Sequence, residues 1–75
     1  MDFSEKTIKA MSEFGLTGYE IKAYLTLLEF GSRTASEISE NSTVPYSKIY
    51  DVLNNLETKG WIEVKQSRPN KFYPK

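Results

Sequence analysis

The sequence predicts a mainly α domain with a small β-hairpin (α+β), in which four helices are followed by two strands. Three observations support this fold class. Apolar side chains recur at helical spacing in four separate segments between residues 4 and 59. A capping residue or a proline precedes each segment. Residues 61–73 instead alternate between apolar and polar side chains around a turn-forming stretch, as a hairpin does. The 75 residues are therefore expected to form a single domain, residues 1–75.

The first predicted helix is the leading helix of segment 1–15. Ser4 has the side chain of an N-cap, and Gly15 suits the C-terminal stop. Its apolar stripe consists of Ile8, Met11 and Phe14. Such a stripe either covers the helix's own domain or contacts a second copy of the chain. In the second case these three residues form a homodimer interface.

The second predicted helix begins at a capping box, Thr17-Gly-Tyr-Glu20, in which the hydroxyl and the carboxylate satisfy backbone amides reciprocally. Gly31 ends this helix. Four apolar residues at spacing i, i+3, i+4 and i+7 are expected to form its buried face. They are Ile21, Tyr24, Leu25 and Leu28.

Residues 34–60 have the pattern of two helices joined by a tight turn. Thr34-Ala-Ser-Glu37 repeats the capping box and opens a short helix, which the polar stretch 41–43 interrupts. Pro45 suits the first position of a longer helix, because the missing amide hydrogen needs no partner there. Lys59-Gly60 closes that helix. Its expected buried stripe is Ile49, Val52, Leu53 and Leu56.

Residues 61–74 predict a two-stranded hairpin. A strand over 61–65 is followed by turn chemistry at Ser67–Asn70 and by a return strand over 71–73. A helix-turn-helix followed by such a hairpin is the layout of a winged helix-turn-helix, in which the hairpin is the wing. This layout places an exposed helix face beside a hairpin tip, and the two together match a DNA major groove and its flanking backbone.

The net charge of zero conceals an uneven distribution. Up to Ser42, four basic residues stand against seven acidic ones, a net charge of −3. From Thr43 onward, six basic residues stand against three acidic ones, a net charge of +3. The gradient suggests that the C-terminal half faces an anion, although chance scatter of solvated charges explains it equally well.

The residue types that are absent exclude several classes of function. Without Cys there is no disulfide framework, and without His or Cys a metal site would depend on carboxylates alone. No nucleophile–base pair or Gly-rich phosphate loop can be assembled, so we expect no enzyme, no cofactor and no metal. The first residues lack the order of a signal peptide, and the longest apolar stretch, residues 23–28, is too short to span a bilayer. We therefore expect a soluble, cytoplasmic domain without a membrane partner.

The residues expected to contact DNA lie on three elements. The first turns of a recognition helix reach base edges, and the expected major-groove set is Pro45, Tyr46, Ser47, Lys48 and Tyr50. The expected wing set, suited to backbone or minor groove, is Arg68, Asn70 and Lys71. Thr34 and Ser36 offer helix N-terminal amides to a phosphate, although Thr34 serves equally well as a simple cap.

Beyond these patterns, residues 15–31 (GLTGYEIKAYLTLLEFG) are similar to the opening of the TrmB-type transcriptional regulators, found mostly in archaea. The similarity continues to the Arg68-Pro69 turn, and its most specific piece is Pro45–Leu53 (PYSKIYDVL). The resemblance implies a winged-helix DNA-binding domain that acts as a dimer and represses or activates promoters. In full-length regulators a further C-terminal domain often binds sugars, so no small-molecule effector is expected for this domain alone.

Together these observations predict sequence-specific binding of double-stranded DNA by a transcriptional regulator. The recognition helix enters the major groove, and the wing lies on the backbone or in the minor groove. The alternative is a winged-helix protein–protein interaction module within a larger assembly, since fold alone does not decide function. The zero net charge favours this alternative.

Overall fold

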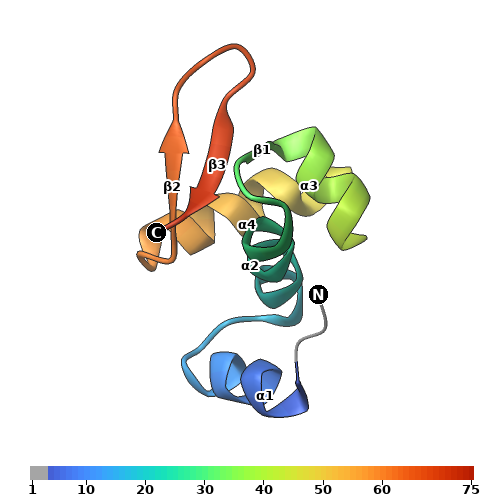
Figure 1. The fold of residues 1–75 in the computed structure, drawn as a ribbon, viewed down its shortest axis with the longest axis vertical. Helices are drawn as coiled ribbons and strands as arrows, with labels where there is room; N and C mark the ends of the chain where they lie inside the picture. Colours follow the sequence, from blue (N-terminus) through green and yellow to red (C-terminus); the bar gives the residue numbers. More distant parts are fainter. Residues whose placement is uncertain (1–3) are drawn as a thin grey trace.

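The computed structural model describes residues 4–75, so residues 1–3 of the predicted leading segment 1–15 lie outside the described residues. The elements are α1 (Glu5–Glu13), α2 (Gly18–Phe30), β1 (Arg33–Thr34), α3 (Ala35–Ser42), α4 (Tyr46–Thr58), β2 (Ile62–Lys65) and β3 (Lys71–Pro74). In Figure 1, α2 lies across α4, with α3 on one side and the sheet on the other, and α1 lies below. All four predicted helices and the predicted hairpin are confirmed.

Local interactions hold both ends of α1. The Ser4 hydroxyl accepts a hydrogen bond from the Thr7 amide at 3.2 Å, as expected of an N-cap. At the other end Gly15 has a φ of +92°, a left-handed conformation that favours glycine. Met11 is 6% exposed and belongs to the hydrophobic core. Helix α1 therefore covers its own domain through Met11.

Helix α2 begins at the predicted capping box, and three of the four residues predicted to face inward are buried or partly buried against the core. The Thr17 amide donates to Glu20 Oε1 at 3.0 Å, and the Glu20 amide donates to Thr17 Oγ1 at 3.2 Å. Ala23 and Leu27 are fully buried, whereas Leu28 is 40% exposed, so the prediction that Leu28 is buried is wrong. The most deeply buried positions of α2 come one residue before the predicted ones, because α3 and α4 both pack on this helix. Ala23 and Leu27 meet them in the core.

Side chains of α3 close the turn between α3 and α4. Ser39 Oγ donates to the Val44 carbonyl at 2.6 Å, and the Val44 amide donates to Ser42 Oγ at 3.2 Å. Thr43 is in the left-handed region with a φ of 63°. Pro45 has an extended ψ of 140° and is the N-cap of α4. Its predicted place as the first helical residue is therefore wrong by one position, because the fixed φ of proline suits both places.

The three strands form an antiparallel sheet in the order β1–β3–β2. Ile62 pairs with Pro74 and Val64 with Phe72, and Ile62 and Phe72 are buried, so this face of the hairpin packs on the core. Strand β1 was not predicted, because two residues are too few to show an alternation. Its pairing of Arg33 with Phe72 attaches the segment before α3 to the wing.

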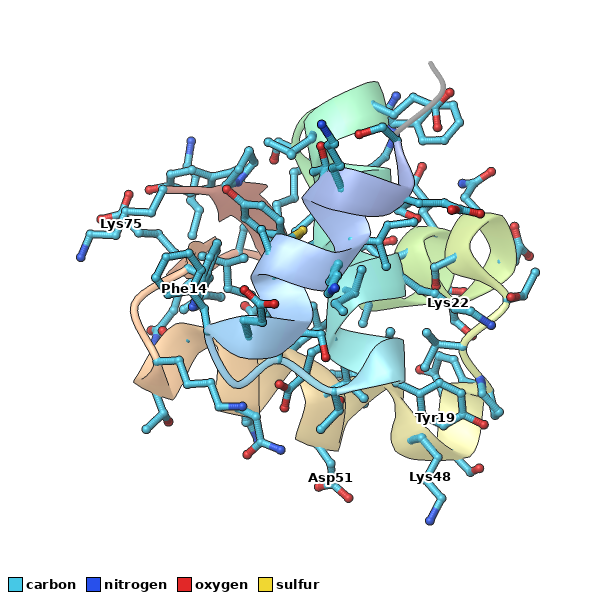
Figure 2. The ribbon with its side chains drawn as sticks, turned by 90° about the horizontal axis from the view of Figure 1, so that it is seen from below. Phe14, Tyr19, Lys22, Lys48, Asp51 and Lys75 are labelled. Carbon is cyan, nitrogen blue, oxygen red and sulfur yellow. The ribbon has the colours of Figure 1, made fainter. Side chains whose placement is uncertain are left out.

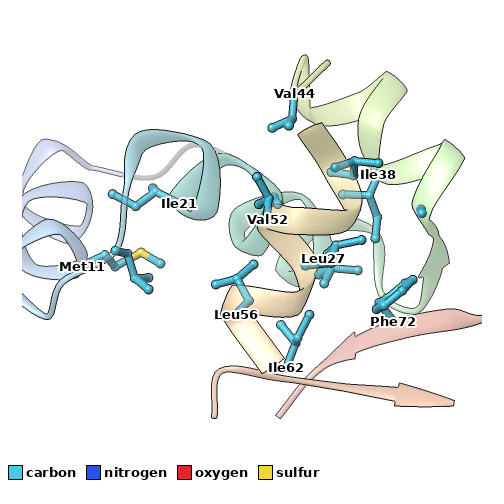
Figure 3. Close-up of a cluster of buried hydrophobic side chains, with 14 residues drawn as sticks. Met11, Ile21, Leu27, Ile38, Val44, Val52, Leu56, Ile62 and Phe72 are labelled. Carbon is cyan, nitrogen blue, oxygen red and sulfur yellow. The ribbon is translucent and has the colours of Figure 1, made fainter. Parts of the chain in front are cut away.

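Buried side chains from the four helices and the wing meet in one hydrophobic core (Figure 3). The predicted stripe of α4 is confirmed there, since Ile49, Leu53 and Leu56 are fully buried and Val52 is 7% exposed. Helix α4 thus turns one face inward and presents the opposite face to solvent. The fold is a winged helix-turn-helix.

Candidate nucleic-acid interface

The exposed face of α4 carries the predicted major-groove set. Tyr46 and Tyr50 are 56% and 51% exposed. Pro45, Ser47 and Lys48 are exposed as well. Because the apolar stripe of the helix faces the core, these side chains project away from it. The structure thus brings the set together at the N-terminal end of α4, the part of a recognition helix that reaches base edges.

Tyr46 and Tyr50 pack against each other one helical turn apart. Their ring centroids are 5.9 Å apart and their planes make an angle of 87°, an edge-to-face pair. A hydrogen bond with the Tyr46 side chain, and then the electrostatic influence of Tyr46, raise the pKa of Tyr50 above its usual 10.0. Like any tyrosine hydroxyl at neutral pH, this group can donate as well as accept hydrogen bonds.

Helix α4 itself has little positive charge. Lys48 is the one basic residue among its 13 residues, and Asp51 and Glu57 are acidic. Figure 2 shows Lys48 and Asp51 projecting outward on the same side of the helix. This face is therefore suited to specific contacts with bases rather than to general attraction of phosphates.

The wing gathers three basic side chains. Arg68 and Lys71 are exposed. Lys65 is also exposed and pairs directly with Lys71 across β2 and β3. Like charges directly opposite each other repel, so an anion bound beside them would relieve the repulsion. The sequence reasoning missed Lys65, although its place at the end of the alternating strand 62–65 was a usable signal.

The turn at the wing tip is held by its own side chains. The Ser67 amide donates to Asn70 Oδ1 at 3.0 Å, and Ser67 Oγ donates to the Pro69 carbonyl at 2.7 Å. Asn70 therefore shapes the turn that carries Arg68. Within the predicted wing set, the charged groups are Arg68 and Lys71, and Asn70 supports them.

The start of α3 is a completed capping box. The Thr34 amide donates to Glu37 Oε1 at 3.0 Å, and the Glu37 amide donates to Thr34 Oγ1 at 3.3 Å. The hydrogen bond from the Thr34 amide is the main cause that lowers the pKa of Glu37 below its usual 4.5. A phosphate at this helix end would compete with the Glu37 carboxylate for the Thr34 amide and with the Thr34 hydroxyl for the Glu37 amide. Ser36, the second residue predicted here, is exposed.

The structure separates the three predicted interface residues of α1. Met11 is buried in its own chain, whereas Ile8 is 40% exposed and Phe14 is 75% exposed. The Phe14 ring lies 6.2 Å from the Trp61 ring, edge to face, and Trp61 in turn lies 5.3 Å from Tyr24. Of the three, Ile8 and Phe14 offer surface to a second copy of the chain.

An ion pair between a buried carboxylate and a partly exposed ammonium group ties α2 to the C-terminal end of α4. Lys59 Nζ lies 2.6 Å from Glu20 Oε1 and 3.0 Å from the Gly15 carbonyl oxygen. Burial opposes ionisation of the Glu20 carboxyl, but hydrogen bonds from Lys59 and from the Thr17 amide outweigh it and hold the pKa of Glu20 below its usual 4.5. The sequence indicated Glu20 as a capping residue, whereas its partner lies 39 residues away and no local pattern reveals it.

The described part of the chain, residues 4–75, has no candidate metal site, pocket or membrane-spanning helix. It contains no group of three or more His, Cys, Asp or Glu residues able to hold a metal ion, and it encloses no pocket. None of its helices is long and apolar enough to cross a membrane.

Comparison with known proteins reveals related sequences. The family model described as sugar-specific transcriptional regulator TrmB matches residues 11–75. The chain is 39% identical over 70 residues to the HTH-type sugar sensing transcriptional regulator TrmBL1 of Pyrococcus furiosus. It is 37% identical over 71 residues to the DNA-binding HTH-type transcriptional repressor TrmBL2 of Thermococcus kodakarensis. Each match covers 93% of this chain but 20% of TrmBL1 and 27% of TrmBL2, so the chain spans about a quarter or less of these relatives.

The fold is also similar to a solved structure. The structure of TrmBL2, described as an archaeal chromatin protein with a novel mode of DNA binding, matches with a TM-score of 0.85 and 36% identity. The match covers 95% of this chain and 28% of that one. The similarity therefore extends over nearly the whole arrangement of helices and wing.

Proposed function

The chain belongs to the TrmB family of transcriptional regulators, and on this premise we propose that it binds double-stranded DNA sequence-specifically as a cytoplasmic regulator of transcription. The N-terminal turns of α4 enter the major groove, and the wing contacts the flanking backbone or the minor groove. The observation that supports this most directly is the exposed face around Tyr46 and Tyr50, on a helix followed by a wing with three basic side chains. The proposal includes no catalytic step and no cofactor.

The wing and α4 differ in charge, and we therefore assign them different roles in DNA binding. Phosphate contacts supply sequence-independent affinity, and base contacts supply specificity. Lys65, Arg68 and Lys71 of the wing are suited to phosphates. Helix α4 is suited to base edges rather than to phosphates, because Asp51 offsets the charge of Lys48 on the side of the helix where both project (Figure 2).

A single copy of the chain is expected to bind duplex DNA weakly, with a Kd on the order of 10⁻⁴–10⁻⁶ M at physiological salt. The small number of cations in the proposed interface is the reason. Fluorescence anisotropy of a labelled duplex, titrated at two or more salt concentrations, measures both the Kd and its salt dependence.

The same titration separates the proposal from the protein–protein alternative, which the zero net charge favours. Binding to DNA through phosphates weakens steeply as salt is added, because condensed counterions are released on binding. If no binding is detected even at low salt, the DNA proposal fails. Salt-insensitive binding of a protein partner would then support the interaction module.

We also place a homodimer contact at α1, through Ile8 and Phe14. Ile8 lies on α1 and Phe14 at its C-terminal cap, and both side chains are exposed. The third member of the predicted set, Met11, packs within its own chain. A symmetric dimer would present two copies of α4 to successive major grooves, roughly 34–36 Å apart.

Replacing Phe14 with serine is expected to weaken self-association by about 2 kcal/mol, roughly thirtyfold, as for the loss of an aromatic anchor at an interface. Sedimentation equilibrium measures the change. Leu28→Ser is the control, because it also replaces an exposed apolar side chain with serine but on α2, away from the proposed contact. A wild-type chain that remains monomeric at high concentration would contradict the dimer.

A further inference from the structure

Two exposed aromatic side chains stand at the start of α4, the end of the helix that is proposed to enter the major groove. Guanine is read best by bidentate arginine or lysine and adenine by bidentate asparagine or glutamine. Helix α4 contains no arginine and a single lysine, Lys48, and its two asparagines, Asn54 and Asn55, lie in its second half. Two tyrosines exposed by half or more dominate its first two turns instead. Thymine is the DNA base that displays an apolar group, its 5-methyl, in the major groove.

From this complementarity we infer that Tyr46 and Tyr50 form an apolar pad that reads thymine 5-methyl groups, so that the chain prefers A·T pairs where this pad meets the groove. The inference rests on the proposed function, because it specifies which base the proposed recognition helix selects. Lys48 is two residues from each tyrosine and so lies on another side of the helix, where it contributes a separate phosphate or guanine contact.

The geometry of the two rings suits this task. Their edge-to-face packing, with centroids 5.9 Å apart, gives each ring a fixed neighbour before DNA arrives. Less side-chain freedom is then lost on binding than for two independent side chains. The separation of the centroids corresponds to about two base-pair steps of ~3.4 Å. The pad is therefore expected to meet two methyl groups within about two steps of each other.

A contact through the tyrosine hydroxyls alone is the competing possibility. Each tyrosine carries six ring carbons against a single hydroxyl oxygen, and both side chains are exposed by half or more, so the rings offer the larger contact surface. The two possibilities differ in one measurable respect. A hydroxyl bound to phosphate is indifferent to a methyl group on the base, whereas an apolar pad is not.

The experiment begins with selection of binding sites for the 75-residue chain from a random-sequence duplex pool. In the selected duplex each thymine is replaced in turn by deoxyuridine, which pairs identically but lacks the methyl group. We expect a loss of affinity of about fourfold at each of one or two positions, the effect of exposing one methyl-sized group. At those positions a C·G pair should bind more weakly than the same pair carrying 5-methylcytosine, whose methyl group lies in the same place in the groove.

Variants assign the effect to the rings. Tyr46→Ala and Tyr50→Ala are expected to abolish the discrimination between thymine and uracil, and Tyr→Phe at either position should preserve it because the ring remains. Leu28→Ala, a change of an exposed apolar side chain on α2, should leave the discrimination as in the wild type. Circular dichroism checks that each variant is folded.

The possible failures are distinguishable. Sequence preference with equal binding of thymine and uracil duplexes overturns the methyl inference and leaves the proposed function intact. Discrimination that persists in both alanine variants overturns it as well. If the chain binds no DNA, or selects no sequence, the proposed function and the inference fail together.

Discussion

Replacing Lys59 with methionine is expected to lower the free energy of unfolding by about 2–3 kcal/mol. The change leaves the Glu20 carboxylate, 2% exposed, without the ammonium group that lies 2.6 Å from it. The effect is smaller than for a wholly buried pair because the Lys59 side chain is 37% exposed. For a domain of this size the melting temperature should fall by roughly 10–20 °C, which calorimetry measures.

The double variant Glu20→Gln/Lys59→Met is the control. It should be more stable than Lys59→Met alone, because glutamine can still cap α2 and brings no uncompensated charge into the interior. Equal stability of Lys59→Met and the wild type would show that the pair contributes nothing.

The pH dependence of stability gives an independent check on the same pair. Because folding lowers the pKa of Glu20, the ionised pair stabilises the native state above the usual carboxyl value of 4.5. This contribution is lost as the pH falls through the lower pKa of the folded state. Unfolding curves measured below pH 4.5 should therefore change less with pH in the double variant.

Removing the charges of Arg68 and Lys71 together is expected to weaken binding to every duplex alike, by roughly a hundredfold. A hydrogen bond to a charged group contributes about 1.5 kcal/mol, and phosphates repeat identically along the duplex. The slope of log affinity against log salt should also fall by about one for each lost contact. Anisotropy titrations of Arg68→Ala/Lys71→Ala against two unrelated duplexes measure both quantities.

Two further variants test whether the loss of affinity comes from the wing and not from any loss of positive charge. Lys6→Ala/Lys9→Ala removes the same charge from exposed positions on α1 and should have little effect on DNA affinity. Ser47→Ala should instead reduce the preference among sequences, because its position at the start of α4 suits contact with base edges. If the wing variant is folded and binds every duplex as tightly as the wild type, the wing is not a DNA contact and α4 must hold the complex alone.

Features set by neighbouring residues could be predicted from the sequence. The two capping boxes, the glycine stops and the stripe of α4 depend on side chains within four or seven positions of each other, and the structure confirms them. The buried face of α2 could not be predicted in the same way. Its apolar residues cover more than half the helix surface, so the sides on which α3 and α4 pack decide that Leu27 is buried and Leu28 exposed.

The candidate interface likewise contains some features that the sequence pattern predicts and others that depend on the three-dimensional structure. The exposure of the α4 residues follows from the opposite, apolar stripe, so the sequence could indicate which of them face solvent. The edge-to-face packing of Tyr46 on Tyr50 depends on side-chain rotamers, and the opposition of Lys65 and Lys71 depends on strand register. Neither is encoded in composition or periodicity. Both were accessible only once the backbone was placed in space.

The central position of β3 in the sheet has a consequence for how such domains diversify. Strand β3 is hydrogen-bonded to β2 on one side and to β1 on the other. The last residue of β1, Thr34, is also the N-cap of α3. Residues 66–70 lie outside this ladder. Because doubling the length of a flexible loop costs only about 0.6 kcal/mol, insertions and deletions at the tip should leave the strand register and the helix-turn-helix undisturbed. The tip is thus a place where natural variation or protein engineering can exchange one DNA contact for another without redesigning the fold.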